Sequence, residues 1–332
     1  MRSLSVVLLV VLSACTLTFE LAPETTVGAE DIATTSALSE ATTTLVLTTT
    51  STPTGPTTTV EEAEARALVT PTGVVVSVLE ESAEGFLVRT PCDNEAVVST
   101  GTRIGTVSVV IDPGHGGEID TGAVGPNGLT ERDLNLVVSQ AVEAKLIVRG
   151  ISVILTRTAN YATTLGTRAA LADAVGADLL LSVHHNAPTP GPSDRPGTEI
   201  FIQHDSADSR RLGGLVWRYV VRELSQFDIQ WSAAPDAGVL SVLSTRGEDA
   251  YGINRNPETV SVLAEIGYIS NRSEAELFAT NVYVEAAAEA LADAVEAYLT
   301  TDDPGSGFVE EPRVFNPQPG LGSAACVEAV LE

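Results

Sequence analysis

Residues 107–117 read VSVVIDPGHGG, an apolar strand that runs directly into a glycine-rich turn. Glycine permits sharp turns with unusual backbone angles, so this turn presents His115 at the carboxyl end of the strand. In α/β proteins, ligands collect at the carboxyl ends of sheet strands. The stretch therefore predicts a buried strand of an α/β domain and a functional position directly after it.

Helix and strand patterns alternate downstream of this turn. Residues 133–149 carry apolar side chains at helical spacing, namely Leu134, Val137, Val138, Ala141 and Val148. Thr130 is a good N-cap for this helix, and Gly150 is a good C-terminal stop. The other expected elements are strands at 151–155, 179–183, 198–203, 239–243 and 260–266, and helices at 165–175, 206–225 and 284–299. We therefore expect an α/β fold, a single sheet with helices on both faces.

Composition divides the chain into five expected parts. They are a signal peptide (1–14), a disordered Thr/Ser-rich linker (15–65), a small β module (70–104), the main domain (105–301) and a C-terminal tail (302–332). The linker has poor periodicity and cannot bury enough apolar surface to offset its ordering entropy. The module carries strand patterns at 73–79, 85–89 and 96–98, and it precedes the α/β sheet.

The N-terminus has the layout of a processed signal. Arg2 precedes an apolar run at residues 6–12, which is too short to span a bilayer. The sequence LSAC at 12–15 then resembles the lipobox of bacterial lipoproteins. That resemblance implies that Cys15 is acylated and anchors the protein to a membrane through an N-terminal lipid. The alternative is an ordinary secretory signal with an incidental cysteine.

The chain is strongly acidic. Its 44 acidic and 18 basic residues among 332 give a formal net charge of −26. Such a surface repels phosphate backbones, so we expect no nucleic-acid partner. Solubility is the simplest role for this charge, and we expect a monomer.

Four positions carry candidate catalytic groups. His115 follows the first strand, Glu131 lies in the first turn of a helix, His184 ends an apolar strand and Glu265 lies within another. Two imidazoles and a carboxylate form a known catalytic zinc set, with water as the fourth ligand, and a second carboxylate beside that water could act as a general base. Taken singly, a loop histidine is commonly surface, and a glutamate at a helix start commonly stabilises the helix dipole. A glutamate in an apolar strand is harder to explain, because burying an unpaired charge is costly.

Residues 107–299 resemble the zinc-dependent N-acetylmuramoyl-L-alanine amidase family (amidase 3). The matching motifs occur in the family order: DPGHGG at 112–117, residues 128–136 with Glu131 and Asn135, LTR at 155–157 with Arg168, SVHHNA at 182–187 and EIGYISN at 265–271. The resemblance implies that His115, Glu131 and His184 bind one zinc ion and that Glu265 is the catalytic glutamate. It also implies that 105–301 is a zinc amidase catalytic domain acting outside the cytoplasmic membrane. Its substrate would be peptidoglycan, cleaved at the amide between the lactyl group of N-acetylmuramic acid and L-alanine of the stem peptide.

Some positions depart from the family pattern. Asn160 stands where aspartate is common, Asp173 where asparagine is frequent, and His185 where the residue is usually small. Because side chains alternate along a strand, His184 and His185 are not expected to face the same metal, and the family position favours His184. We also expect Glu199 to neighbour the site.

Two other functions are compatible with the same fold, and one loop bears on autoinhibition. A non-catalytic wall-binding lipoprotein on the same fold would be expected to lack Glu265 or a zinc ligand. A zinc peptidase that cuts within the stem peptide could use the same fold, because the details of a site set its substrate. Some relatives carry a long autoinhibitory helix where this chain has a short Pro-rich loop at 187–196, so we expect no built-in plug.

The chain has three cysteines. If Cys15 carries lipid, Cys92 and Cys326 are left over, and we hypothesise a disulfide that pins the C-terminal tail onto the small β module. Two unrelated thiols are the alternative.

Overall fold

The computed structural model describes residues 64–317 and 322–332. The predicted signal peptide, Cys15 and the linker up to residue 63 lie outside these residues. Within the described ranges, no helix is long and apolar enough to cross a membrane.

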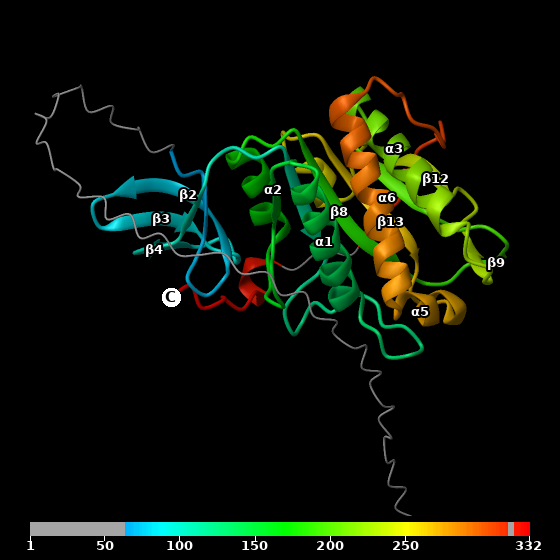
Figure 1. The fold of residues 1–332 in the computed structure, drawn as a ribbon, viewed down its shortest axis with the longest axis horizontal. Coiled ribbons are helices and arrows are strands. Elements are labelled where there is room, and N and C mark those ends of the chain that lie inside the picture. Colours follow the sequence, from blue (N-terminus) through cyan, green and yellow to red (C-terminus); the bar gives the residue numbers. More distant parts are fainter. Residues whose placement is uncertain (1–63, 318–321) are drawn as a thin grey trace, which may run out of the picture. The chain divides into compact units, whose positions relative to one another are not determined.

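A seven-stranded sheet forms the centre of the main domain (Figure 1). In spatial order its strands are β14 (Arg313–Val314), β12 (Gly238–Leu243), β10 (Glu199–Ile202), β13 (Ser261–Tyr268), β8 (Leu179–Asn186), β6 (Val109–Pro113) and β7 (Val153–Leu155). The strands from β13 to β7 are parallel, and β10 is antiparallel to β13. The carboxyl ends of β6, β8 and β13 therefore meet at one edge, where β10 begins.

Helices cover both faces of this sheet, so the predicted α/β fold class is confirmed. On one face lie α1 (Glu131–Val148), α3 (Ala207–Leu224) and α6 (Asn281–Thr300), and on the other lie α2 (Leu165–Ala174) and α4 (Gly252–Arg255). Apolar residues of each buried strand point alternately to the two faces and form one hydrophobic core on each. Leu179 and Leu181 of β8 face the α1 side, whereas Leu180 faces α2. The helix α5 (Arg272–Phe278) follows β13, and β9 (Gly191–Ser193) pairs with β11 (Trp231–Ala233) as a separate sheet.

Helix α1 starts as predicted but buries a different stripe. The Thr130 hydroxyl accepts a hydrogen bond from the Asp133 N–H at 3.3 Å, which confirms the predicted N-cap. The buried apolar side chains are Leu134, Val138, Val142 and Leu146. The prediction that Val137 and Val148 belong to the buried face is wrong, because they are 48% and 88% exposed. The stripe that is buried instead packs against α6 and against the strands β6, β7 and β8.

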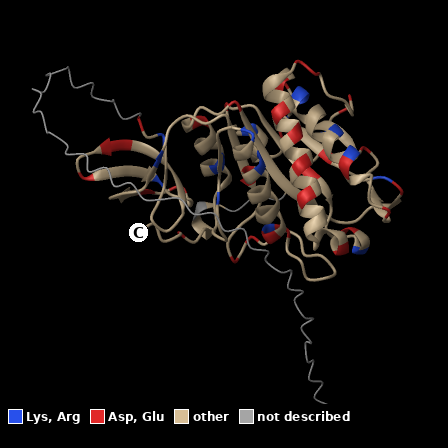
Figure 2. Ribbon diagram, in the orientation of Figure 1, with Lys and Arg blue, Asp and Glu red and all other residues tan. Residues whose placement is uncertain are grey.

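The acidic charge is carried partly by α6, along which Figure 2 shows a row of acidic residues. Glu289 of this row pairs with Lys145 and Arg149 of α1, at 2.9 and 2.7 Å, and Asp293 pairs with Arg149 at 2.9 Å. These half-exposed pairs join two helices that already share an apolar core, so they add little to stability individually.

A small antiparallel sheet precedes the main domain. Its spatial order is β4 (Glu95–Val98), β3 (Gly85–Arg89), β2 (Val75–Ser82), β1 (Ala67–Val69) and β5 (Thr102–Ile104). Strands β2, β3 and β4 correspond to the three predicted strands, whereas the three-residue strands β1 and β5 were not predicted. Ala67 and Val75 belong to the same buried cluster as Leu171 of α2, so this sheet packs on the α2 side of the domain.

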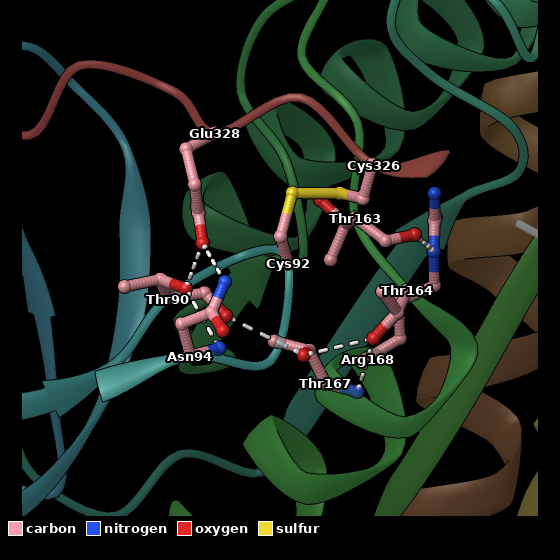
Figure 3. Close-up of a disulfide and its surroundings, with 9 residues drawn as sticks. All are labelled: Thr90, Cys92, Asn94, Thr163, Thr164, Thr167, Arg168, Cys326 and Glu328. Carbon is pink, nitrogen blue, oxygen red and sulfur yellow. Dashed lines mark hydrogen bonds between the residues drawn. A yellow bond between two sulfur atoms is a disulfide. The ribbon is translucent and has the colours of Figure 1, made fainter. Parts of the chain in front are cut away.

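The C-terminal residues are fastened at two places. β14 extends the central sheet by pairing with β12. Further on, Cys326 forms a disulfide with Cys92 of the small sheet, the pairing that was hypothesised from the sequence (Figure 3). Next to it, the Glu328 carboxylate accepts hydrogen bonds from Thr90 Oγ1 and Asn94 Nδ2, at 2.5 and 2.8 Å. The described residues of the tail, for which no element had been predicted, therefore belong to the folded structure.

Candidate active site

His115 is held in place by the turn that follows β6. Its φ of 62° lies in the left-handed region, which non-glycine residues rarely adopt. Its Nδ1 is 2.6 Å from Asp120 Oδ1, and its Nε2 is 3.1 Å from Glu131 Oε1. Asp120 thus fixes the ring so that the opposite nitrogen faces Glu131.

Glu131 is the first residue of α1, where its carboxylate also meets the positive end of the helix dipole. The residue is only 5% exposed. Its Oε2 accepts a hydrogen bond from the Ala123 N–H at 2.9 Å, and its Oε1 accepts one from the His185 N–H at 3.2 Å. Two backbone donors therefore fix this carboxylate between the two histidine rings.

His184 reaches the same point from the end of β8. Its Nδ1 is 3.0 Å from Glu131 Oε1. The approach depends on Gly114, because a Cβ at that position would lie 2.2 Å from the His184 ring. Gly122 has the same role toward Glu131, where a Cβ would lie 2.5 Å from Oε2. The glycines around the turn thus leave space for the imidazoles and the carboxylate to converge.

One potential ligand atom from each of His115, Glu131 and His184 lies within 4.8 Å of the other two. Burial disfavours charge on His115, but its hydrogen bonds with Asp120 and Glu131 prevail and raise its pKa to about 10. Burial also opposes ionisation of Glu131, yet the two imidazoles hold its pKa well below the ordinary value. The carboxylates of Glu131 and Asp120 thus stabilise positive charge at the point where the two imidazoles meet. Two imidazoles and one carboxylate suit a catalytic zinc ion. The orientation of the His115 ring by a second carboxylate, that of Asp120, is also typical of such sites.

Glu265 lies beside this group. In the parallel β13–β8 pair it is directly opposite His184, so the two side chains point to the same face of the sheet. Its Oε2 is buried without a hydrogen-bond partner among the described residues. Burial, reinforced by the carboxylates of Glu131 and Glu199, raises the pKa of Glu265 well above its ordinary value. His115, Glu131, His184 and Glu265 all line one cleft.

His185 points away from this cleft. Its Nδ1 is 2.7 Å from Asn135 Oδ1, and its Nε2 is 2.5 Å from the Tyr283 hydroxyl on α6. The ring is fully buried, and burial lowers its pKa to about 3. His185 is therefore a neutral support between α1 and α6, and His184 is the histidine that faces Glu131.

The other unusual positions have structural partners. Asn160 Oδ1 accepts a hydrogen bond from the Gly117 N–H at 2.9 Å, which steadies the His115 turn. Asp173 accepts hydrogen bonds from the Thr259 N–H and hydroxyl, at 2.9 and 2.8 Å, far from the histidines in sequence. Glu199 lies opposite Glu265 in the β10–β13 pair. The described segment 187–196 contains β9 and no helix.

Two supporting residues were not singled out from the sequence. One is Asp120, which orients His115. The other is Asp112, which is 1% exposed, pairs with Arg168 at 2.6 Å and accepts a hydrogen bond from Ser182 at 2.6 Å. Asp112 lies inside the DPGHGG motif, so an aspartate ending an apolar strand was an available signal. Asp120 follows that motif in a loop without any regular pattern.

Comparisons with known proteins agree with this geometry. Residues 109–297 match the family described as N-acetylmuramoyl-L-alanine amidase. The "Uncharacterized protein YqiI" of Bacillus subtilis is 37% identical over 193 residues, covering 58% of this chain and 84% of that protein. The N-acetylmuramoyl-L-alanine amidase AmiA of Escherichia coli is 30% identical over 233 residues, covering 62% of this chain and 79% of that one. The crystal structure of an N-acetylmuramoyl-L-alanine amidase from Clostridium difficile 630 superposes with a TM-score of 0.51 at 28% identity, covering 60% of this chain and all of that one.

Proposed function

Because the chain belongs to the N-acetylmuramoyl-L-alanine amidase family, we propose that it hydrolyses the amide between the lactyl group of N-acetylmuramic acid and L-alanine of the peptidoglycan stem peptide. The observation that carries this proposal is the convergence of His115, Glu131, His184 and Glu265 in one cleft. These groups come from four different elements, so their meeting has no simple explanation in packing alone.

The proposed cofactor is one zinc ion, held by His115, Glu131 and His184. When bound, zinc lowers the pKa of a coordinated water and polarises an amide carbonyl. The chain's own contribution is to fix the three ligands before the metal arrives. Asp120 orients the ring of His115, and backbone N–H groups of Ala123 and His185 orient the carboxylate of Glu131.

Glu265 is the proposed general base. Its carboxylate would take a proton from the attacking water and deliver it to the nitrogen of the departing L-alanine. A carboxyl group with a raised pKa suits both halves of this transfer, because it accepts a proton readily and holds it until the amide bond breaks. The unpartnered Oε2 atom is free of competing hydrogen bonds within the described part of the chain.

The cleft suits a polymeric substrate. Its volume is about 1350 Å³, larger than the roughly 300–1,000 Å³ of ordinary small-molecule sites. We propose that the enzyme works outside the cytoplasmic membrane. We also propose that a lipid on Cys15 anchors it there and that it has no built-in autoinhibitory plug. Intact mass of the membrane-extracted protein tests the lipid. Digestion of purified wall without added protein tests the absence of a plug, and strict dependence on a partner would contradict it.

Digestion of purified peptidoglycan tests the activity. Wild type is expected to release free L-alanine N-termini, and Glu265→Gln is expected to release at least about 100-fold fewer. Glu248→Gln is the matched control, because it removes another carboxylate from the same cleft outside the proposed catalytic group. Release by Glu265→Gln at the wild-type rate would exclude the proposed base. New glycan reducing ends would indicate a glycosidase. Cleavage within the stem peptide would indicate a peptidase, and binding of peptidoglycan without cleavage would indicate a wall-binding protein.

Metal analysis tests the cofactor independently of turnover. Purified wild type is expected to contain about one zinc per chain, and Glu131→Gln is expected to lose most of it, since one of three ligands is weakened. Chelation should abolish L-alanine release, and added zinc should restore it. Full activity after exhaustive chelation would contradict the zinc proposal.

A further inference from the structure

Arg313 comes from the C-terminal tail, beyond the residues that match the family. It lies in β14 beside Val242 of β12. Its guanidinium donates to both oxygens of Asp236, at 3.0 Å from Nε and 2.5 Å from Nη2. The same Nη2 also contacts Glu199 Oε1. One arginine therefore joins the tail to two carboxylates of the catalytic domain.

Glu199 is the important partner of this arginine. It is 1% exposed, and its second oxygen accepts hydrogen bonds from Asn186 Nδ2 and the Tyr268 hydroxyl, both at 2.7 Å. Asn186 ends β8, which carries His184, and Tyr268 ends β13, which carries Glu265. The Glu199 carboxylate thus ties together the ends of two strands that supply the proposed site.

Glu199 is also the direct cross-strand neighbour of Glu265 in the antiparallel β10–β13 pair. Directly opposite residues have Cβ atoms about 4.5–5.5 Å apart on the same face, and like charges there repel. Among the residues that the structure describes, Arg313 is the one cation that pairs with Glu199. Its guanidinium also lies 5.4 Å from the centre of the Phe201 ring, which limits its freedom to turn away.

We propose that Arg313 is a positioning residue for the hydrolysis. By pairing with Glu199, it prevents an unpaired carboxylate from displacing Glu265. It also holds the Glu199 contacts with Tyr268 and with Asn186, which lines the cleft. Arg313 itself does not line the cleft, so it acts through Glu199. This inference rests on the proposed amidase function, and it assigns to the tail a part in the chemistry.

The test measures kcat and KM for release of L-alanine N-termini from a soluble muropeptide. Arg313→Met is expected to lower kcat about 10- to 100-fold with KM changed less than about threefold, a smaller loss than that from removing a general base. Adding Glu199→Gln to Arg313→Met removes the unpaired charge as well, and is expected to recover most of the lost kcat. A role limited to fastening the tail would give no such recovery.

Arg218→Met is the matched control. Arg218 also binds the tail, through a bidentate pair with Asp303 at 2.6 and 3.0 Å. The Arg218→Met substitution is expected to leave kcat unchanged. Should Arg313→Met fail to fold, Arg313→Lys carries the test, because lysine keeps the charge but cannot reach both carboxylates as a planar fork. It should lower kcat at least about threefold.

The outcomes separate the two proposals. If wild type releases no L-alanine N-termini, the amidase function fails and the role of Arg313 falls with it. If wild type is active, an unchanged kcat in Arg313→Met or Arg313→Lys overturns the role of Arg313 alone. A double variant as slow as the single variant also overturns it.

Discussion

Glu274 is a buried carboxyl group whose titration should be visible in the stability of the protein. It lies on α5, with its side chain inaccessible to solvent. Its two oxygens accept hydrogen bonds from the backbone N–H groups of Ser232 and Tyr268, at 2.7 and 2.6 Å. Tyr268 is the last residue of β13, so this carboxyl group fixes the end of the strand that carries Glu265.

The sign and size of the effect follow from burial. Burial raises the pKa of Glu274 from 4.5 to about 7, although the two backbone N–H groups oppose the shift. A group whose pKa is raised by folding stabilises the fold fully below its unfolded pKa and loses that contribution as pH rises through the folded pKa. The shift of about 2.5 pKa units corresponds to roughly 3 kcal/mol of unfolding free energy, lost mainly between about pH 4.5 and 8.

Urea unfolding of wild type and Glu274→Gln across this pH range measures the contribution. Glutamine offers one acceptor oxygen instead of two, so at pH 4.5 the variant should be about 1–3 kcal/mol less stable. Because glutamine does not ionise, the advantage of wild type over the variant should shrink by roughly 3 kcal/mol by pH 8. Glu276→Gln, an exposed change on the same helix, is the control. A wild-type advantage that stays constant or grows with pH would refute the reasoning.

Two further predictions concern the disulfide and the turn around His115. Reduction of Cys92–Cys326 should lower the unfolding free energy by about 2–5 kcal/mol, since the bond spans 234 residues of sequence and restricts the unfolded chain. Denaturation with and without dithiothreitol measures this loss of unfolding free energy. The double variant Cys92→Ala/Cys326→Ala is the control and should not respond to the reductant. Equal denaturation midpoints of wild type with and without dithiothreitol would contradict the prediction. Gly114→Ala should displace the His184 ring, at a cost of about 1–3 kcal/mol in stability and with loss of bound zinc. Gly166→Ala is the control and should retain the metal, because a Cβ there meets nothing within 4 Å. A Gly114→Ala protein that binds a full complement of zinc would contradict the prediction, since the turn would then accommodate the added Cβ.

The positions that face the proposed metal could be predicted because their constraints are local. An apolar run fixes which strand is buried, and the glycines after β6 show where the chain must turn. The two-residue period of a strand separates His184 from His185, and the structure shows the physical consequence: one ring faces Glu131 and the other packs beneath α6. Glu265 could be found because a carboxylate in an apolar strand needs an explanation.

The strands that were not predicted are too short to show a period, and the helices α4 and α5, of four and seven residues, were also not predicted. β1, β5, β9 and β11 have three residues each and β14 has two, less than is needed to distinguish alternation from chance. The buried stripe of α1 was misjudged for a related reason. The spacing of apolar residues in α1 is helical on either assignment. Only the packing of the helix against the sheet and α6 decides that Val142 and Leu146 are covered while Val137 and Val148 are not.

The contribution of the tail lies beyond both local pattern and family resemblance. Arg313 is 114 residues from Glu199, so that pairing leaves no signal in the nearby sequence. The pairing of Cys326 with Cys92, over 234 residues, could be hypothesised only from the number of cysteines. Three of these residues, Arg313, Cys92 and Cys326, also lie outside the range 109–297 that matches the family. The family pattern accounts for the residues of the proposed metal site and for the proposed general base. The tail adds two contacts outside that pattern: the disulfide of Cys326 to the small sheet, and the pairing of Arg313 with the carboxylate of Glu199, which lies opposite Glu265.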